Sequence, residues 1–244
     1  MKTAAPPGIE FPPLRASSAT RSAAIAQIRS ALEDTGMVTL RSFVDADEQQ
    51  RYATEFIASG GQMKVSGTDR KYSLKYEQIA HHEIVHRASS AEMLGLVNEL
   101  LSGGPGGKIT LTPPDVQVGY SITSKRGDFV SFHFDHLCVL NVLVPVVLPA
   151  SVAEEPATLS LWPNVLPFGG TTRYPVRSKL CLLAGRTAAV HGLPLRTYEY
   201  RAGDALLFYG ARSLHGVFKR NTDGLRAVAS INYRFPNLEE LARS

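Results

Sequence analysis

The side chains best suited to bind a metal ion are two histidines and one aspartate, which occur in two short stretches. His133 and Asp135 lie in an apolar, strand-like run, and His215 occurs much later in the chain. Side chains two residues apart on a β-strand point to the same side, so one ion can contact both His133 and Asp135. We expect His215 to arrive from a distant strand. Two imidazoles and one carboxylate are the set that holds non-haem ferrous iron on one face and leaves the other face open.

An arginine adds to this pattern. Arg226 follows His215 by eleven positions, and a Gly-Asp dipeptide precedes His215. With His133-x-Asp135, the arrangement resembles the ferrous-iron and 2-oxoglutarate-dependent dioxygenases over about residues 115–235. Within that family we expect a small-molecule oxygenase of the phytanoyl-CoA-hydroxylase-like or prolyl-hydroxylase-like kind. The alternative is that both histidines are ordinary strand residues that cap a core.

The resemblance implies Fe(II) as the metal, with 2-oxoglutarate and O2 as cosubstrates. His133, Asp135 and His215 would then be both the metal ligands and the catalytic residues. Neutral imidazoles and one carboxylate leave the ion with a net positive charge, which favours an anionic chelator. Arg226 suits the far carboxylate of 2-oxoglutarate, because a guanidinium binds a carboxylate through two parallel hydrogen bonds. The alternative for Arg226 is a surface arginine on the last strand.

Three further polar residues are candidates for holding 2-oxoglutarate. Tyr120 precedes the His-x-Asp motif, at about the place where the family often has a polar cofactor contact. Asn141 lies in an apolar run, where a buried amide needs a hydrogen-bond partner. Ser230 is four residues beyond Arg226 and on the same face of the expected strand.

The resemblance also predicts the outcome of the reaction. Relatives that halogenate have a small residue where this chain has Asp135, so the carboxylate favours hydroxylation. We expect hydroxylation of an unactivated C–H bond in a small molecule, such as a free amino acid or a natural-product intermediate. Two alternatives remain open: a protein or nucleic-acid hydroxylase of the same fold, and a non-catalytic jelly-roll protein that binds a metal or a sugar.

Composition bounds the class of protein. The 244 residues are 44% apolar and 20% charged, which is ordinary for a globular protein. No apolar run is long enough to span a bilayer, and the N-terminus lacks an apolar signal core, so we expect a cytoplasmic protein without membrane contacts. Two cysteines make a disulfide framework improbable. The net charge of +4 comes from scattered residues, which suits anionic ligands and makes nucleic acid an unlikely partner.

The order of elements predicts an α+β fold. Residues 1–17 form an N-terminal arm, and residues 18–244 form one dioxygenase domain, with helical support over about 18–107 and a jelly-roll core over about 108–236. We expect helices over about residues 21–34, 46–59 and 90–101. Nine strands are expected over 108–111, 116–122, 128–134, 139–147, 157–162, 196–200, 205–209, 216–219 and 225–235. Such a series of strands predicts a double-stranded β-helix, the cupin-like jelly roll, with the N-terminal helices packed on one face.

Two interruptions are candidates for covering the site. Residues 60–77 form a long polar stretch, and residues 164–194 interrupt the strands and contain a short helix over 177–184. Long loops in compact domains often close over a substrate, although a solvated connection is as reasonable for the first. The first stretch carries four cations, which predict a substrate with an anionic group: Lys64, Arg70, Lys71 and Lys75.

Overall fold

The computed structural model describes ten segments of the chain, residues 7–10, 17–59, 64–65, 72–73, 79–102, 110–149, 158–167, 175–191, 196–218 and 223–234. Its helices are α1 (Ser18–Thr35), α2 (Ala46–Ala58), α4 (Glu83–Ala88), α5 (Ala91–Ser102) and α7 (Pro175–His191). Its strands are β1 (Gly8–Glu10), β2 (Met37–Arg41), β3 (Lys64–Val65), β4 (Tyr72–Ser73), β5 (Val116–Thr123), β6 (Val130–His133), β7 (Cys138–Val147), β8 (Thr158–Trp162), β9 (Arg196–Glu199), β10 (Ala205–Phe208), β11 (Leu214–Val217) and β12 (Arg226–Arg234).

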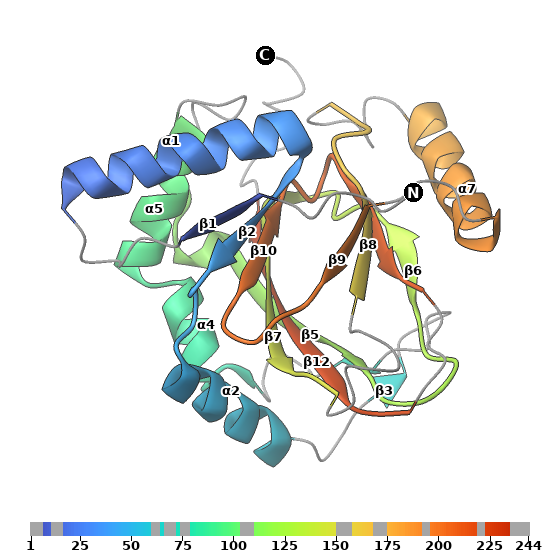
Figure 1. The fold of residues 1–244 in the computed structure, drawn as a ribbon, viewed down its shortest axis with the longest axis horizontal. Coiled ribbons are helices and arrows are strands. Elements are labelled where there is room, and N and C mark those ends of the chain that lie inside the picture. The colour runs from blue at the N-terminus through green and yellow to red at the C-terminus, as the bar shows by residue number, and fades with distance from the viewer. Residues whose placement is uncertain are drawn as a thin grey trace.

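Two sheets form the centre of the molecule (Figure 1). The larger has the order β1-β2-β10-β7-β12-β5-β4-β3, and the smaller has the order β6-β11-β8-β9. Apart from the parallel pair β1–β2, neighbouring strands are antiparallel. Side chains from both sheets share one core cluster, which includes Leu143, Leu206, Phe208 and Val228 from the larger and Leu159, Leu161, Tyr198 and Val217 from the smaller. This is the double-stranded β-helix of an α+β protein, as the sequence predicts.

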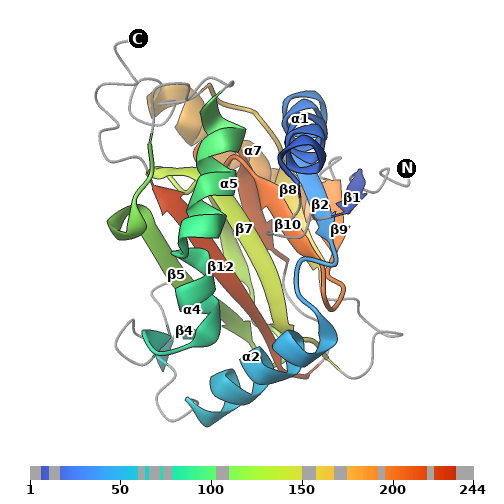
Figure 2. The same ribbon diagram turned by 90° about the vertical axis from the view of Figure 1, so that its left-hand side faces the viewer.

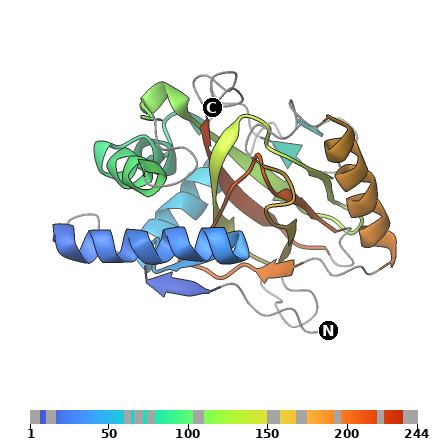
Figure 3. The same ribbon diagram turned by 90° about the horizontal axis from the view of Figure 1, so that it is seen from above.

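The N-terminal helices cover the outer face of the larger sheet (Figure 2). Helices α1, α2, α4 and α5 share the largest core cluster with that face of β5, β7 and β12. Helix α7 lies on the opposite side of the molecule, over the smaller sheet (Figure 3). There it packs Cys181 and Leu182 against Phe132 and Phe134, the side chains that flank His133. The site is therefore built between two sheets whose outer faces are both supported by helices.

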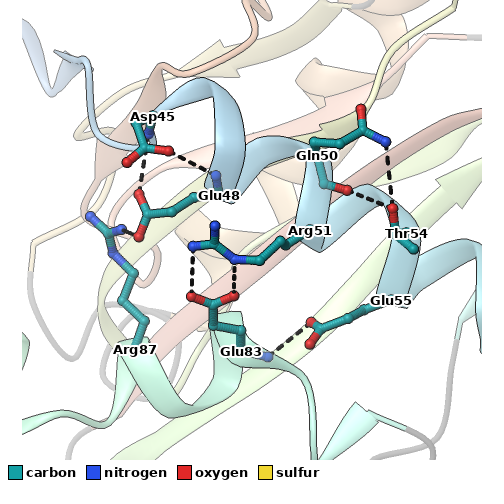
Figure 4. A network of polar contacts seen from close by, with 8 residues as sticks. All are labelled: Asp45, Glu48, Gln50, Arg51, Thr54, Glu55, Glu83 and Arg87. Carbon is teal, nitrogen blue, oxygen red and sulfur yellow. Dashed lines mark hydrogen bonds and ion pairs between the residues drawn. The ribbon is translucent and has the colours of Figure 1, made fainter.

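Polar contacts fix the start of α4 against α2 (Figure 4). Arg51 donates two hydrogen bonds to the Glu83 carboxylate, at 2.7 and 3.0 Å, and Glu55 accepts one from the Glu83 main chain at 2.9 Å. Arg87 forms an ion pair with Glu48, which also completes the capping box at the start of α2. These contacts hold in place the segment before α4, which reaches β5 of the larger sheet.

The structure extends or corrects several expectations. The N-terminal half contributes strands to the larger sheet: β2, which the brief alternation over residues 37–40 predicts, pairs with β10, and β1 pairs with β2. Residues 110–112 are not in a strand, although a strand was expected over 108–111. The helical spacing of Tyr52, Phe56 and Ile57 predicts that all three lie on one buried face of α2; Tyr52 and Phe56 are buried, but Ile57 is 63% exposed. Helix α7 confirms and lengthens the helix expected over 177–184. No described helix is both long and apolar enough to pass through a membrane.

The two candidate covering loops are only partly described. Strands β3 and β4 lie within residues 60–77, pair with each other, and join the larger sheet through β5. Lys64 is part of β3. The other three cations of this loop, Arg70, Lys71 and Lys75, lie outside the described residues, as does part of the interruption over 164–194.

Candidate active site

The smaller sheet places the two histidines beside each other. In the antiparallel pair β6–β11, His215 is the direct cross-strand partner of His133, and the centres of their rings are 4.4 Å apart. Asp135 follows two residues after His133, just beyond the end of β6. Each of the three side chains offers one ligand atom, and these atoms all lie within 4.8 Å of one another. The predicted metal ligands therefore form one cluster.

Hydrogen bonds to the main chain fix which imidazole nitrogens face this cluster. Nδ1 of His133 lies 2.7 Å from the carbonyl oxygen of Ser131, and Nδ1 of His215 lies 3.1 Å from that of Ser213. A carbonyl oxygen only accepts, so each Nδ1 carries a proton and donates. In a neutral ring the lone pair is then on Nε2, and the two Nε2 atoms lie 3.5 and 3.3 Å from Asp135 oxygens. Three electron-pair donors thus converge, which favours a cation between them.

A glycine allows the two strands to approach this closely. A Cβ atom on Gly216 would lie 2.8 Å from the carbonyl oxygen of Val130 and 3.1 Å from the main chain of Phe132. Contacts below 3.0 Å require the backbone to move. The residue after His215 therefore has to be glycine for β11 to lie against β6 in this register.

Asp135 is held as a carboxylate. Burial raises the pKa of its carboxyl group, but His215 and His133, when their rings carry a positive charge, and a hydrogen bond from Asn141 outweigh burial and bring the pKa well below its usual range. Its main chain is also anchored, because Asp135 N donates to the carbonyl oxygen of Gly210 at 3.3 Å. An ionised, fixed carboxylate is the form that binds a metal ion.

A cavity of about 270 Å³ joins this cluster to Arg226. Its lining includes the two histidines, Asp135, Tyr200 and Ser230. Arg226 is only 2% exposed, and its guanidinium carbon lies 4.8 Å from the centre of the Tyr200 ring. Burial raises the pKa of Tyr200, and the neighbouring arginine offsets part of that rise, so the phenol is neutral at physiological pH. The cavity thus joins three side chains that could hold a metal ion to a buried guanidinium that suits an anionic ligand.

The three other predicted cofactor residues are placed differently from one another. Ser230 lines the cavity, and its hydroxyl donates to Asn232 Oδ1 at 3.0 Å. Tyr120 borders the cavity, but its hydroxyl lies 2.9 Å from His82 Nδ1 within the core under the helices. Asn141 donates to Asp135 from behind the cluster. Only Ser230 therefore has the placement that the sequence suggested for a cofactor contact.

Two residues of this region were not identified from the sequence. Tyr200, just after β9, lies under Arg226. His82 is fully buried between Tyr120 and Ser59, whose hydroxyl is 2.6 Å from His82 Nε2. The polar neighbours of His82, which are His81 and Glu83, favour a solvated helix start, and for His82 this interpretation is wrong. Neither residue has a local sequence signal, because each contact joins elements that are distant in the chain.

No protein-family model and no curated protein sequence matches this chain. Solved structures do. The non-haem alpha-ketoglutarate-dependent epimerase SnoN from nogalamycin biosynthesis is 17% identical, with 89% of this chain and 85% of that chain covered and a TM-score of 0.60.

HygX from Streptomyces hygroscopicus, with nickel and 2-oxoglutarate bound, is 14% identical and has a TM-score of 0.59; the alignment covers 86% of this chain and 87% of HygX. A prolyl hydroxylase from Trichoplax adhaerens, bound to a peptide of hypoxia-inducible factor, is 13% identical and has a TM-score of 0.56; the alignment covers 94% of this chain and 98% of the hydroxylase. At this identity the similarity shows a shared fold, and the alignments extend over most of both chains.

Proposed function

We propose that the protein is an Fe(II) and 2-oxoglutarate-dependent oxygenase that hydroxylates a C–H bond of a small molecule. The observation that carries this proposal is the convergence of His133, Asp135 and His215, with both Nδ1 atoms bonded to main-chain carbonyls. The shared fold with SnoN, HygX and a prolyl hydroxylase supports it, because two of these are described as 2-oxoglutarate-dependent or 2-oxoglutarate-bound.

The residues present fit both groups that the fold implies. Two imidazoles and one carboxylate match the ligand set of non-haem ferrous iron. Arg226, buried in the same cavity, matches the far carboxylate of 2-oxoglutarate. Bound together, ferrous iron and 2-oxoglutarate supply the activation of O2, with succinate and carbon dioxide as the coproducts.

The protein's own contribution is to bind, orient and exclude water. Arg226 would hold the carboxylate of 2-oxoglutarate, with the Ser230 hydroxyl as a second contact, and the Tyr200 ring would fix the guanidinium. Apolar side chains line much of the remaining cavity and would keep water from the reacting centre, including Leu143, Leu159, Val217 and Val228. The carboxylate of Asp135 supports hydroxylation over halogenation, as the sequence suggested.

A small molecule is the substrate class that we propose. The site cavity has a volume of about 270 Å³, which suits a compact ligand. SnoN is described as an enzyme of nogalamycin biosynthesis, which supports a natural-product intermediate, and a free amino acid stays a prediction from the sequence.

The test is turnover with candidate substrates. Purified protein would receive ferrous iron, 2-oxoglutarate and O2 with a panel of amino acids and natural-product intermediates. We expect succinate formation that depends on substrate, and a product heavier by one oxygen. His136 gives a matched control, because it is exposed and outside the cluster. His136→Ala should retain succinate formation and His215→Ala should lose it, whereas equal turnover in both variants would refute the proposed site.

A further inference from the structure

We propose that Asn141 is a positioning residue for the metal ligand Asp135, and that the absence of a side chain at Gly210 makes the contact between them possible. The proposal rests on the proposed function, because it assigns Asp135 to the metal. It gives Asn141 a role different from the cofactor contact suggested by the sequence.

The position of Asn141 makes its amide unusual. It lies in β7, where nine of the ten residues are buried, and it is 0% exposed. Its neighbours Leu140 and Val142 belong to the apolar core under the helices. Placing an amide in such a strand costs free energy unless the amide forms hydrogen bonds.

Only one of the two polar atoms of this amide has a hydrogen-bond partner among the described residues. Asn141 Nδ2 donates to Asp135 Oδ2, and because an ionised carboxylate only accepts, the nitrogen has to face Asp135. The other amide atom, Oδ1, has no hydrogen-bond partner among the described residues. An apolar residue would avoid this cost, so stability of the strand does not explain the asparagine. The bond to Asp135 does.

Gly210 completes the arrangement from the opposite side. A Cβ atom at this position would lie 2.0 Å from Asn141 Oδ1 and 3.1 Å from Asp135 Cβ. The φ angle of Gly210 is not in the left-handed region, so glycine is required here for space and not for backbone conformation. The Gly210 carbonyl also accepts the Asp135 main-chain N–H. The main chain of Asp135 is thus bonded to Gly210, and its carboxylate is bonded to Asn141, whose amide lies against Gly210.

This arrangement distinguishes the two carboxylate oxygens of Asp135. Oδ2 accepts the hydrogen bond from Asn141, and Oδ1 does not have this contact. The bond restricts rotation of the carboxylate and so fixes how it faces the two histidines, with Oδ1 3.5 Å from His133 Nε2 and Oδ2 3.3 Å from His215 Nε2. Groups of this kind, which hold metal ligands without touching the metal, typically change metal affinity about 10–100-fold when removed.

The experiment measures Co²⁺ binding to the metal-free full-length protein, by titration of the cobalt d–d absorption. The variants are Asn141→Ala and Gly210→Ala, and the matched control is Asn98→Ala. Asn98 also makes two hydrogen bonds, of 3.0 and 2.7 Å, but to the main chain of Leu111 at the helical side. Circular dichroism checks that each protein is folded.

We expect both site variants to bind Co²⁺ about 10–100-fold more weakly, with an altered d–d spectrum. Asn98→Ala should keep the wild-type affinity and spectrum, even if it is less stable. Because Gly210→Ala displaces Asn141 without removing it, this variant tests the proposal independently if Asn141→Ala does not fold. Wild-type affinity and spectrum in a folded Asn141→Ala or Gly210→Ala protein would overturn the proposal. Failure of the wild-type protein to bind Co²⁺ would instead refute the metal site itself.

Discussion

Removal of Arg226 should weaken 2-oxoglutarate binding more than any other single change outside the metal ligands. Arg226 is 2% exposed and lines the same cavity as His133, Asp135 and His215, so a carboxylate bound to its guanidinium would be removed from water. Loss of one partner of a buried, hydrogen-bonded charge pair costs about 2–5 kcal/mol. At about 1.4 kcal/mol for each factor of ten, Arg226→Ala should raise the dissociation constant of 2-oxoglutarate about 30-fold to about 4,000-fold.

The assay is an anaerobic titration of the iron-loaded protein with 2-oxoglutarate, followed by the absorption of the iron chelate. Arg226→Lys should give an intermediate constant, because lysine keeps the charge but loses the two-pronged geometry. Arg201→Ala is the control, because Arg201 is exposed beyond the end of β9. An unchanged constant in Arg226→Ala would show that another basic group holds the cosubstrate.

Three further predictions follow from the structure. His133→Ala and His215→Ala should abolish succinate formation while near-ultraviolet circular dichroism stays native, and turnover by either variant would contradict its assignment as a ligand. Gly216→Ala should lower the free energy of unfolding by about 1–3 kcal/mol, because its Cβ would overlap a β6 carbonyl. Gly95→Ala, where the Cβ meets no described atom within 4 Å on helix α5, should be neutral or stabilising by up to about 1 kcal/mol, and equal denaturant curves for both would refute the steric argument. Burial lowers the pKa of His82 from its ordinary 6.5, an effect partly offset by a nearby glutamate, so the folded protein resists protonation that the unfolded chain accepts. The free energy of unfolding should therefore fall as the pH drops below about 6.5, less so in His82→Gln, and parallel pH profiles would contradict this.

Part of the cluster of His133, Asp135 and His215 was predictable from a local signal. His133 and Asp135 are two residues apart, and the period of a β-strand alone places them on one side. His215 was identified through its spacing to Arg226 in a known pattern. The strand around it was expected over 216–219 but covers Leu214–Val217, between β6 and β8. Pairing on both sides decides the boundary there, and a single sequence does not show such pairing.

The residues behind the ligands were less predictable. Tyr120 and Ser230 are both on strands of the larger sheet, whose two faces are covered by helices on one side and by the smaller sheet on the other. Strand β5 alternates, and Tyr120 shares a face with Val118 and Ile122 in the core under the helices, whereas Ser230 lines the cavity with Arg226. Asn141 was correctly identified as a buried amide that needs a partner. The bond to Asp135 was not foreseen, because the turn that brings Asp135 to Asn141 is set by tertiary contacts; a contact with the cofactor stays a prediction.

The number of ferrous ions bound per chain tests the central claim most directly. Anaerobic equilibrium dialysis of the full-length protein would measure bound iron with and without 2-oxoglutarate, for wild type and for the His215→Gln and His136→Gln variants. The account predicts one ferrous ion per chain in wild type and in His136→Gln, tighter binding when 2-oxoglutarate is present, and loss of the ion in His215→Gln. Stoichiometric iron binding that persists in His215→Gln would contradict the assignment of His133, Asp135 and His215 as the metal centre.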